Sequence, residues 1–312
     1  MLTQGWTHLC KCLVIATISA VMLADASADS RVRLKDEHAD FRVIHRPTTT
    51  PVLELAVFDA DRSVTHSASN VVLWAGPSTR FDLPSGTPFG EEGDPIWILP
   101  QNQFSDTLYL GLSTENLPGA LFRSVITLRL LRVEGPGKFF AWQAASFGKF
   151  LMKFDSRTTT TAPNRIEMSP GNHQHYNWGF TAPGAYAVTL QAETVITGSP
   201  QIVRTRPTTF VFHITPMPEA SNYREWTFHY FTPMEVGGPD AIDADPDGDG
   251  QNNLREFAAG TSPCDAQSVL PPVFAGNVGG EPARWTWTQR TDVQGIEVSP
   301  EWAEDITGPW QP

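Results

Sequence analysis

The chain has few cysteines, and most of them lie near its start. Of the three cysteines in 312 residues, Cys10 and Cys12 belong to an N-terminal segment that we expect to be removed. Cys264 is then alone, so no internal disulfide can form. Stability is therefore expected to come from a packed core and from bound metal.

Long apolar runs are also scarce. The one from Cys12 to Ala24 is shorter than the roughly 20 residues that span a bilayer. A lysine precedes it and the small residues Ala26-Ser27-Ala28 follow it, which is typical of a secretory signal peptide; a membrane anchor is the weaker alternative. We predict a signal peptide over residues 1–28 and a mature chain without a transmembrane anchor. Its expected location is secreted or periplasmic, with the cell surface as a further option.

Basic residues are outnumbered. The chain has 22 Lys and Arg against 34 Asp and Glu, a formal net charge of -12. Nucleic acids and anionic lipids bind basic surfaces, so this balance argues against both as partners. Metal ions or small ligands are the expected partners, and other envelope proteins are a second class.

Catalytic motifs are missing as well. There is no G-x-S-x-G and no H-E-x-x-H, and Cys264 sits beside an acidic segment rather than in a nucleophile motif. The glycines of Glu134-Gly-Pro-Gly137 lack the lysine and the following helix of a phosphate loop, so we interpret them as a turn. We predict that the protein is not an enzyme.

The sequence does contain many short apolar runs between Val52 and Ile214, separated by Gly, Pro, Asn and Ser. Such spacing is typical of strands joined by tight turns. We predict a mostly β protein with an immunoglobulin-like β-sandwich over residues 29–216.

The composition changes after the sandwich. Aromatic residues from Tyr223 onward recur at helical spacing, with Ser221 as the expected N-cap and Pro233 as the stop. We predict a helix-loop-helix with a calcium loop over residues 217–266. A small β-rich segment is expected over 267–312, where Trp285 and Trp287 alternate with polar residues, as do Ile296 and Val298.

The loop of this unit is the strongest motif in the chain. Residues 245–256, DPDGDGQNNLRE, fit the calcium pattern D-x-D-x-D-G-x5-E. Calcium prefers six to eight oxygen ligands. The predicted ligands are Asp245, Asp247, Asp249, the Gln251 carbonyl, Asn253 (directly or through water) and Glu256. A solvated acidic linker is the alternative, but it would not need glycine at the sixth place or glutamate at the twelfth.

This segment resembles the helix-loop-helix found near the C-terminal end of many secreted bacterial proteins. Its DxDxDGxxNxxE core is similar to dockerin and thrombospondin type 3 repeats. The resemblance implies calcium binding and a spacer or presentation role.

Residues 171–180, GNHQHYNWGF, contain two of the eight histidines. Because side chains alternate between the faces of a strand, His173, His175 and Asn177 are predicted to share one face. The opposite, core-facing row is Gln174, Tyr176, Trp178 and Phe180. Two imidazoles can hold a transition metal such as zinc if a third ligand comes from another strand. Spacing alone favours a solvated polar face, with a metal site as the alternative.

Residues from about 31 to 214 resemble the choice-of-anchor M domain of bacterial surface proteins. The matching motifs, in order, are the H-x-D of LKDEHADFRV, IWILPQNQ, LYLGLSTENL, LRVEGPGKFFAWQAASFG, FDS and HQHYNWGFTAPGAYAVTLQA. The resemblance implies a β-sandwich. Some members are encoded beside ABC transporters of the metal-uptake type, which implies a metal or metal complex as ligand.

The same resemblance joins distant residues into one site. The implied ligands are His38, Asp40, His173 and His175, a set that suits zinc or manganese. Asn177 or Gln101 would orient them through hydrogen bonds. The chain differs from the family in having one copy of the domain and no recognisable wall-sorting signal.

A carbohydrate-binding or adhesive module is the alternative function, because the chain has 10 tryptophans. Stacking on sugars needs exposed rings, yet Trp142 and Trp178 are predicted to face the core, and Trp74 lies in an apolar run. We therefore predict a secreted, non-catalytic surface or periplasmic binding protein, with a structural calcium site and a transition-metal or metal-complex site on a histidine face.

Overall fold

The computed structural model describes residues 31–122, 124–158, 164–233, 238–270, 273–275, 284–286 and 288–296. The predicted signal peptide, Trp287 and Val298 lie outside the described residues. The described part is mostly β, which confirms that part of the prediction. None of its helices is long and apolar enough to cross a membrane.

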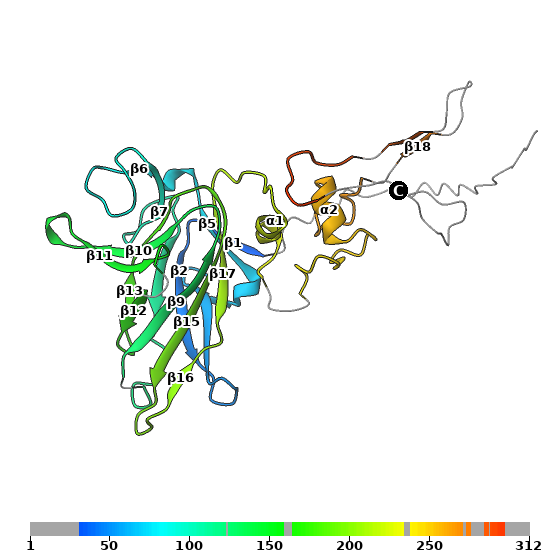
Figure 1. Cartoon of the computed structure of the whole chain (residues 1–312). Coiled ribbons are helices and arrows are strands. Elements are labelled where there is room, and N and C mark those ends of the chain that lie inside the picture. Colours follow the sequence, from blue (N-terminus) through cyan, green and yellow to red (C-terminus); the bar gives the residue numbers. More distant parts are fainter. Residues whose placement is uncertain are drawn as a thin grey trace, which may run out of the picture.

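Seventeen of the strands precede the first α-helix (Figure 1). In chain order they are β1 (Val32–Leu34), β2 (His38–His45), β3 (Leu53–Asp59), β4 (Val64–His66), β5 (Val71–Ala75), β6 (Arg80–Asp82), β7 (Pro95–Leu99), β8 (Tyr109–Ser113), β9 (Ile126–Glu134), β10 (Phe139–Ala144), β11 (Phe150–Asp155), β12 (Arg165–Met168), β13 (His173–His175), β14 (Asn177–Phe180), β15 (Gly184–Val195), β16 (Ile202–Arg204) and β17 (Thr208–Ile214). Three 3-10 turns lie among them, at Ala68–Asn70, Pro77–Thr79 and Ser146–Gly148.

These strands form three sheets. The large sheet has the order β1-β5-β17-β15-β9-β12, with β16 paired to β15. What we call the histidine sheet has the order β13-β8-β2-β3-β4, and the third sheet has the order β11-β10-β14-β7-β6. Most pairs are antiparallel, but β1–β5, β5–β17 and β2–β8 are parallel.

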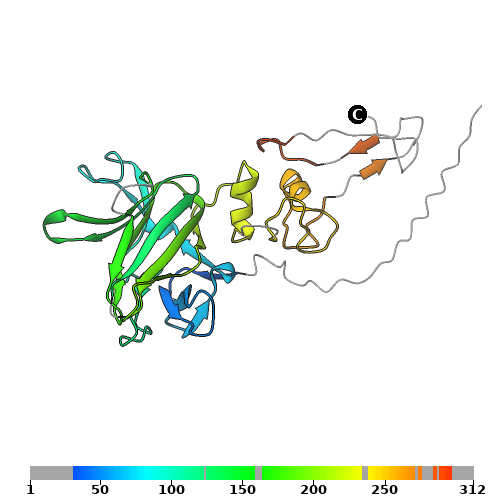
Figure 2. The same cartoon turned by 60° about the horizontal axis from the view of Figure 1, so that its bottom comes forward.

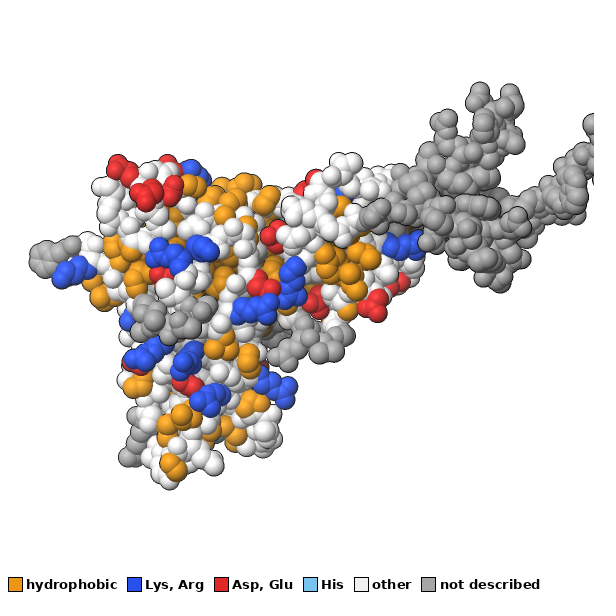
Figure 3. Space-filling view, in the orientation of Figure 1, with side chains coloured by type: hydrophobic (Ala, Val, Ile, Leu, Met, Phe, Trp, Pro, Cys, Tyr) orange, Lys and Arg blue, Asp and Glu red, His pale blue; other side chains and the backbone are white. Residues whose placement is uncertain are grey.

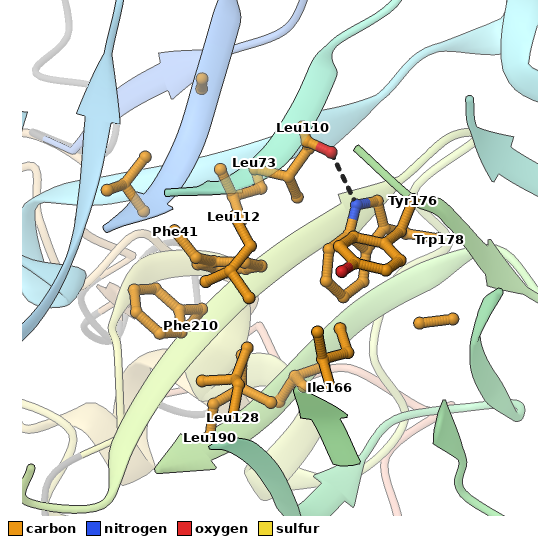
Figure 4. Packing of buried hydrophobic residues seen from close by; sticks show 14 of the residues in the cluster. Phe41, Leu73, Leu110, Leu112, Leu128, Ile166, Tyr176, Trp178, Leu190 and Phe210 are labelled. Atoms are coloured by element: carbon orange, nitrogen blue, oxygen red, sulfur yellow. Dashed lines mark hydrogen bonds between the residues drawn. The ribbon is translucent and has the colours of Figure 1, made fainter. Parts of the chain in front are cut away.

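One hydrophobic core is shared by all three sheets. Figure 4 shows Phe41 and Leu112 of the histidine sheet lying against Phe210 and Leu190 of the large sheet, with Trp178 of the third sheet beside them. All five side chains are at most 1% exposed. Fully burying a side chain of this kind contributes roughly 1.5–3 kcal/mol, so this shared core is the main stabilising feature.

The histidine sheet and the third sheet meet at Tyr176, between the end of β13 and the start of β14. The sequence predicts one continuous strand here, but Tyr176 separates two strands that belong to different sheets. Trp178 joins the sheets again, because its indole Nε1 donates a hydrogen bond to the Leu110 carbonyl at 2.9 Å (Figure 4). Gln174 is exposed at the predicted core-facing position, and β13 is the edge strand of this sheet among the described residues.

The third sheet is buried on both sides. Phe139 belongs to the shared core, whereas its strand neighbours Phe140 and Trp142 pack on the opposite face against Leu83 and Phe89. Trp142 is therefore buried as expected, but not in the main core, because the segment after β6 folds over this face.

The first helix, α1 (Tyr223–Tyr230), is docked on the large sheet (Figure 2). Its N-cap is Asn222, whose side chain accepts from the Glu225 N–H, and not Ser221 as predicted. It ends at Tyr230, ahead of Pro233. Phe228 packs on alanines of β15, which anchors the helix to the sheet.

The second helix, α2 (Asn253–Ala259), packs against the first. Phe257 is fully buried between Trp226 and Tyr223. The helix ends at Gly260, whose φ of 80° is the left-handed conformation that glycine adopts readily.

The C-terminal part includes one antiparallel hairpin, β18 (Val273–Ala275) with β19 (Arg284–Thr286). The described residues 288–296 form no strand. Instead Val293 and Ile296 pack against the helix pair, and the Arg290 N–H donates to the Ala258 carbonyl at 2.7 Å. The expected strand around Ile296 is therefore wrong for the part that is described, because this residue covers the helices.

Candidate metal centre

Three neighbouring strands place the predicted ligands on the outer face of the histidine sheet. β2 runs parallel to β8, and β13 runs antiparallel on the other side of β8. The register aligns Asp40 with Gly111 and with His175, so both side chains project over the same position of the central strand. Alternation along each strand brings His38 and His173 to the same face.

The central strand leaves room for these side chains to meet. A Cβ atom on Gly111 would lie 2.9 Å from Cε1 and 3.0 Å from Nε2 of His175, and it would also overlap a carboxylate oxygen of Asp40. Any side chain at this position would therefore push the ligands apart. The absence of a side chain at Gly111 therefore leaves the space that Asp40 and His175 occupy.

Four donor groups converge above this glycine. One ligand atom from each of His38, Asp40, His173 and His175 lies within 4.8 Å of the others, and the group could hold a metal ion. The carboxylate of Asp40 is 2.7 Å from Nε2 of His173 and 3.8 Å from Nε2 of His38. Donors around a tetrahedral zinc ion lie roughly 3.3 Å apart, given bonds of about 2.0 Å, so the two distances bracket that separation.

Burial controls the protonation of the group. Asp40 is 2% exposed, and burial raises the pKa of its carboxyl, although His173 and His38 oppose the shift. Burial and the neighbouring His173 and His38 lower the pKa of His175 to about 3. His175 is therefore neutral at pH 7, which is the form that binds metal ions.

Two ring nitrogens in the group lack a hydrogen-bond partner. Nε2 of His38 and Nδ1 of His175 are buried, and neither has a partner in the described part of the chain. A buried polar atom without a partner costs roughly 1–3 kcal/mol. Coordination of an ion is a direct way to satisfy such nitrogens, which favours a metal site over the solvated polar face.

Tyr109 orients one of the ligands. Its ring stacks on His175 with the centroids 3.5 Å apart and the planes 1° from parallel. It also contacts His38, with the centroids 5.0 Å apart. The tyrosine therefore restricts the ring orientation of His175 through packing.

We expect Tyr109→Ala to weaken zinc binding by about tenfold, because a ligand that is no longer held in place must be ordered on binding. Tyr109→Phe keeps the stacked ring and should stay within about threefold of the wild type. Zinc titration against a competing chelator measures both. Equal affinities of the alanine and phenylalanine variants would show that the stack does not orient the ligand.

Asn177 and Gln101 do not contact the histidines. The Asn177 amide donates to Oε1 of Gln101, and the Gln101 N–H donates to Oδ1 of Asn177. Oε1 of Gln101 also accepts from the Ala144 N–H. These hydrogen bonds join β14, the end of β10 and the segment after β7 within the third sheet, because Asn177 lies on β14 and not on the strand that carries the histidines. Their predicted role of orienting the ligands is wrong.

Sequence reasoning missed Gly111 and Tyr109. Both lie in the segment LYLGLS, where Tyr109, Gly111 and Ser113 alternate with leucines that face the core. A small residue in the middle of an outward-facing row is the available signal, since glycine in a strand often marks a close approach of other groups.

The acidic loop forms a second group. One carboxylate oxygen from each of Asp245, Asp247 and Asp249 lies within 4.8 Å of the others. Their side chains also order the loop: Asp245 accepts from the N–H groups of Gly248 and Gly250, at 2.9 and 3.0 Å. Gly250, the sixth residue, has a φ of 91°, which explains the glycine at this place.

Several oxygens of this loop are buried without a partner in the described residues. They are Asp247 Oδ2, Asp249 Oδ2, Asn253 Oδ1 and both carboxylate oxygens of Glu256. Glu256 is fully buried, and burial together with the three aspartates raises its pKa to about 8. Oxygen atoms of this kind, gathered in one short loop, are the ligands that calcium prefers.

Asn253 also has a structural role. Its amide nitrogen donates to the Pro239 and Ala241 carbonyls, both at 2.7 Å, so only Oδ1 remains available. The Gln251 N–H donates to Oδ1 of Asp249 at 2.6 Å, and its carbonyl stays a predicted ligand.

Comparison of the chain with protein-family models, with curated proteins and with solved structures gave no match. The chemistry of the two groups is therefore the basis for assigning a function.

Proposed function

We propose that the protein is a secreted, non-catalytic binding protein whose main domain holds a transition-metal ion, zinc or manganese, through His38, Asp40, His173 and His175. The observation that carries this proposal is the convergence of these four donors above Gly111. Three imidazoles and one carboxylate form a mixed N/O set suited to zinc, and to manganese less strongly.

A role in binding rather than catalysis follows from the number of donors. Catalytic zinc sites usually have three protein ligands and leave one position for water or substrate. Here four side chains would fill a tetrahedral shell. The histidines are nevertheless partly accessible, with the side chains of His38 and His173 exposed by 28% and 26%. An ion could therefore enter from solvent and leave again.

Zinc titration tests the proposal. With a competing chelator, we expect wild-type affinity on the order of nanomolar. The His173→Ala/His175→Ala variant removes two of four ligands and should bind at least about 100-fold more weakly. His66→Ala is the control, because His66 lies on β4 at the far edge of the sheet and should leave the affinity unchanged. Similar affinities of the double variant and the wild type would disprove the assignment.

We further propose that the loop of residues 245–256 binds calcium and orders the helix-loop-helix. The support is the spacing of its carboxylates, its glycine at the sixth place and its unpartnered oxygens. The ligands would be Asp245, Asp247, Asp249, Gln251, Asn253 and Glu256. Because α1 is fixed to the large sheet and α2 packs on α1, an ordered loop would hold the C-terminal part in a defined position as a spacer.

Calcium binding is expected to release protons in a pH-dependent way. With a pKa of about 8, Glu256 is mostly protonated at pH 7 when no cation is bound, and it must lose the proton to act as a ligand. We expect release of about one proton per calcium at pH 7 and almost none at pH 9. The apparent affinity should therefore rise with pH and level off above 8. Calorimetry in buffers of different ionisation enthalpy measures the release.

Glu256→Gln is the control for this experiment, since it removes the titrating group and keeps the shape of the side chain. Its calcium binding should be weaker and free of the proton release. A wild-type protein that takes up calcium at pH 7 with no proton release would contradict the role of Glu256.

We propose that the sheets form an immunoglobulin-like sandwich. The support is a feature known as a tyrosine corner: Tyr186, near the start of β15, donates its hydroxyl to the carbonyl of Ala182 four residues earlier, at 2.9 Å. The division of the second layer into two sheets and the three parallel strand pairs are departures from the simplest form of that fold.

Tryptophan stacking gives little support to a carbohydrate-binding module. Trp97, Trp142, Trp178 and Trp226 are each at most 4% exposed. Trp74 is partly buried, and the Arg33 guanidinium covers its ring at 4.4 Å. None of these five tryptophans therefore presents an open ring face on which a sugar could stack.

A further inference from the structure

A hollow of about 320 Å³ lies at the opposite end of β2 from the metal centre. The β2–β3 connection, drawn as a blue loop at the lower end of the molecule in Figure 1, forms one wall, and the start of β17 forms the other. Arg46 is six residues beyond Asp40, which corresponds to about 20 Å along a strand. The hollow is therefore separate from the metal site.

Two arginines line this hollow with most of their donors available. Arg46 donates from Nε to Glu54 at 2.7 Å, and Arg206 donates from Nη2 to the Thr50 carbonyl at 3.4 Å. A guanidinium has five N–H donors, so each arginine uses one of them within the described residues. Both residues are exposed.

The arginines of the large sheet provide a contrast. Figure 3 shows Lys and Arg side chains gathered on the face of the molecule that carries β9 and β15. There Arg129 and Arg204 both bind Glu193, and Arg165 binds Glu167. In the hollow, two arginines face a single glutamate, which leaves an uncompensated positive charge in a protein of net charge -12.

The other residues that line the hollow further restrict which chemical groups its ligand can carry. Glu54, whose side chain is 43% exposed, can accept hydrogen bonds from hydroxyl groups. Pro51, Leu53 and Leu55 supply an apolar surface. The volume corresponds to roughly ten water molecules, which is enough for a ligand the size of one sugar ring.

These features together select a ligand with an anionic group, hydroxyl donors and a partly apolar face. Sulfate and phosphate would not use the apolar surface and would bring no sugar hydroxyl groups to Glu54. A neutral sugar would leave the Arg206 guanidinium without an anion, since only Arg46 is paired with Glu54. We propose that the hollow binds a uronic acid unit, whose carboxylate lies between Arg46 and Arg206 and whose hydroxyl groups donate to Glu54. Paired guanidinium donors suit a carboxylate in particular.

The test compares two sugars that differ in one group. Methyl β-glucuronide carries a carboxylate where methyl β-glucoside carries a hydroxymethyl group. Binding to the mature full chain, with zinc and calcium present, is followed by NMR titration. We expect the glucuronide to bind at least tenfold more tightly than the glucoside, and we expect Arg206→Gln to reduce glucuronide binding at least tenfold. Arg80→Gln, which changes an exposed arginine on β6, should leave binding unchanged.

The proposal is overturned if neither sugar binds, if both bind equally, or if Arg46→Gln and Arg206→Gln both bind the glucuronide as the wild type does. Acetate that competes as well as the glucuronide would show that the site recognises a carboxylate alone, and would also overturn the proposal. Zinc content should be the same in all variants, so failure here does not affect the metal assignment.

Discussion

Gly111→Ala is expected to reduce zinc affinity at least about 100-fold, which corresponds to about 2.8 kcal/mol. The new methyl group would occupy the space in which Asp40 and His175 approach one another. The ligands would separate, and the tetrahedral arrangement could not form. The fold itself should persist, because this position faces outward while the neighbouring Leu110 and Leu112 face the core.

Gly119→Ala is the matched control. Gly119 has open space around its Cβ position, so the substitution adds the same methyl group without touching a ligand. Circular dichroism and thermal unfolding of both variants should resemble those of the wild type. Wild-type zinc affinity in Gly111→Ala would mean that the four side chains do not bind the ion together.

The Asp245→Ala/Glu256→Ala variant is expected to lose the calcium response of the helix-loop-helix. In the wild type, calcium at 1,000 times its dissociation constant should add about 4 kcal/mol to the free energy of unfolding of this unit. For a unit of this size, that shift raises the melting temperature by well over 5 °C. The variant lacks the first and last ligands of the loop, so its melting temperature should not change with calcium.

Glu91→Ala/Glu92→Ala is the control for charge. It removes two exposed carboxylates from another acidic segment, and its calcium response should equal that of the wild type. Differential scanning calorimetry with calcium and with a calcium chelator measures the response. A rise in melting temperature that survives in Asp245→Ala/Glu256→Ala would exclude the loop as the source.

The periodicity of the sequence predicts the local features of the candidate metal centre well. His173 and His175 do share a face, because side chains alternate on any strand regardless of which sheet the strand joins. The same alternation continues through Tyr176, so it gives no sign that the chain passes from one sheet to another there. The result was a single predicted strand in place of β13 and β14.

Partners distant in the sequence could not be predicted from spacing. His38 and Asp40 meet the histidines only because β2 lies parallel to β8 and β13 lies on the other side, a strand order that no local pattern specifies. The family resemblance suggested these two residues, and the structure brings them together with His173 and His175. The role of Gly111 can be recognised only when the strand register is known. It depends on Asp40 and His175, which lie opposite Gly111 on the two neighbouring strands.

In the acidic loop, by contrast, the residues that come together are close in the sequence. Its donors lie within twelve consecutive residues, so the motif alone predicts which oxygens come together, and the three aspartates do so. The N-cap of α1 shows the limit of such local patterns. Ser221 and Asn222 are both good capping residues, so the sequence does not decide between them, and in the structure the Asn222 side chain accepts from the Glu225 N–H.

Metal content is the most direct test of the central claim, that the histidine sheet holds a transition metal. The protein is purified without a histidine tag, exposed to zinc, dialysed against metal-free buffer and analysed for its elements. The account predicts about one zinc ion per chain in the wild type and almost none in His173→Ala/His175→Ala. A wild-type protein that retains no zinc, or a double variant that retains as much as the wild type, would contradict it.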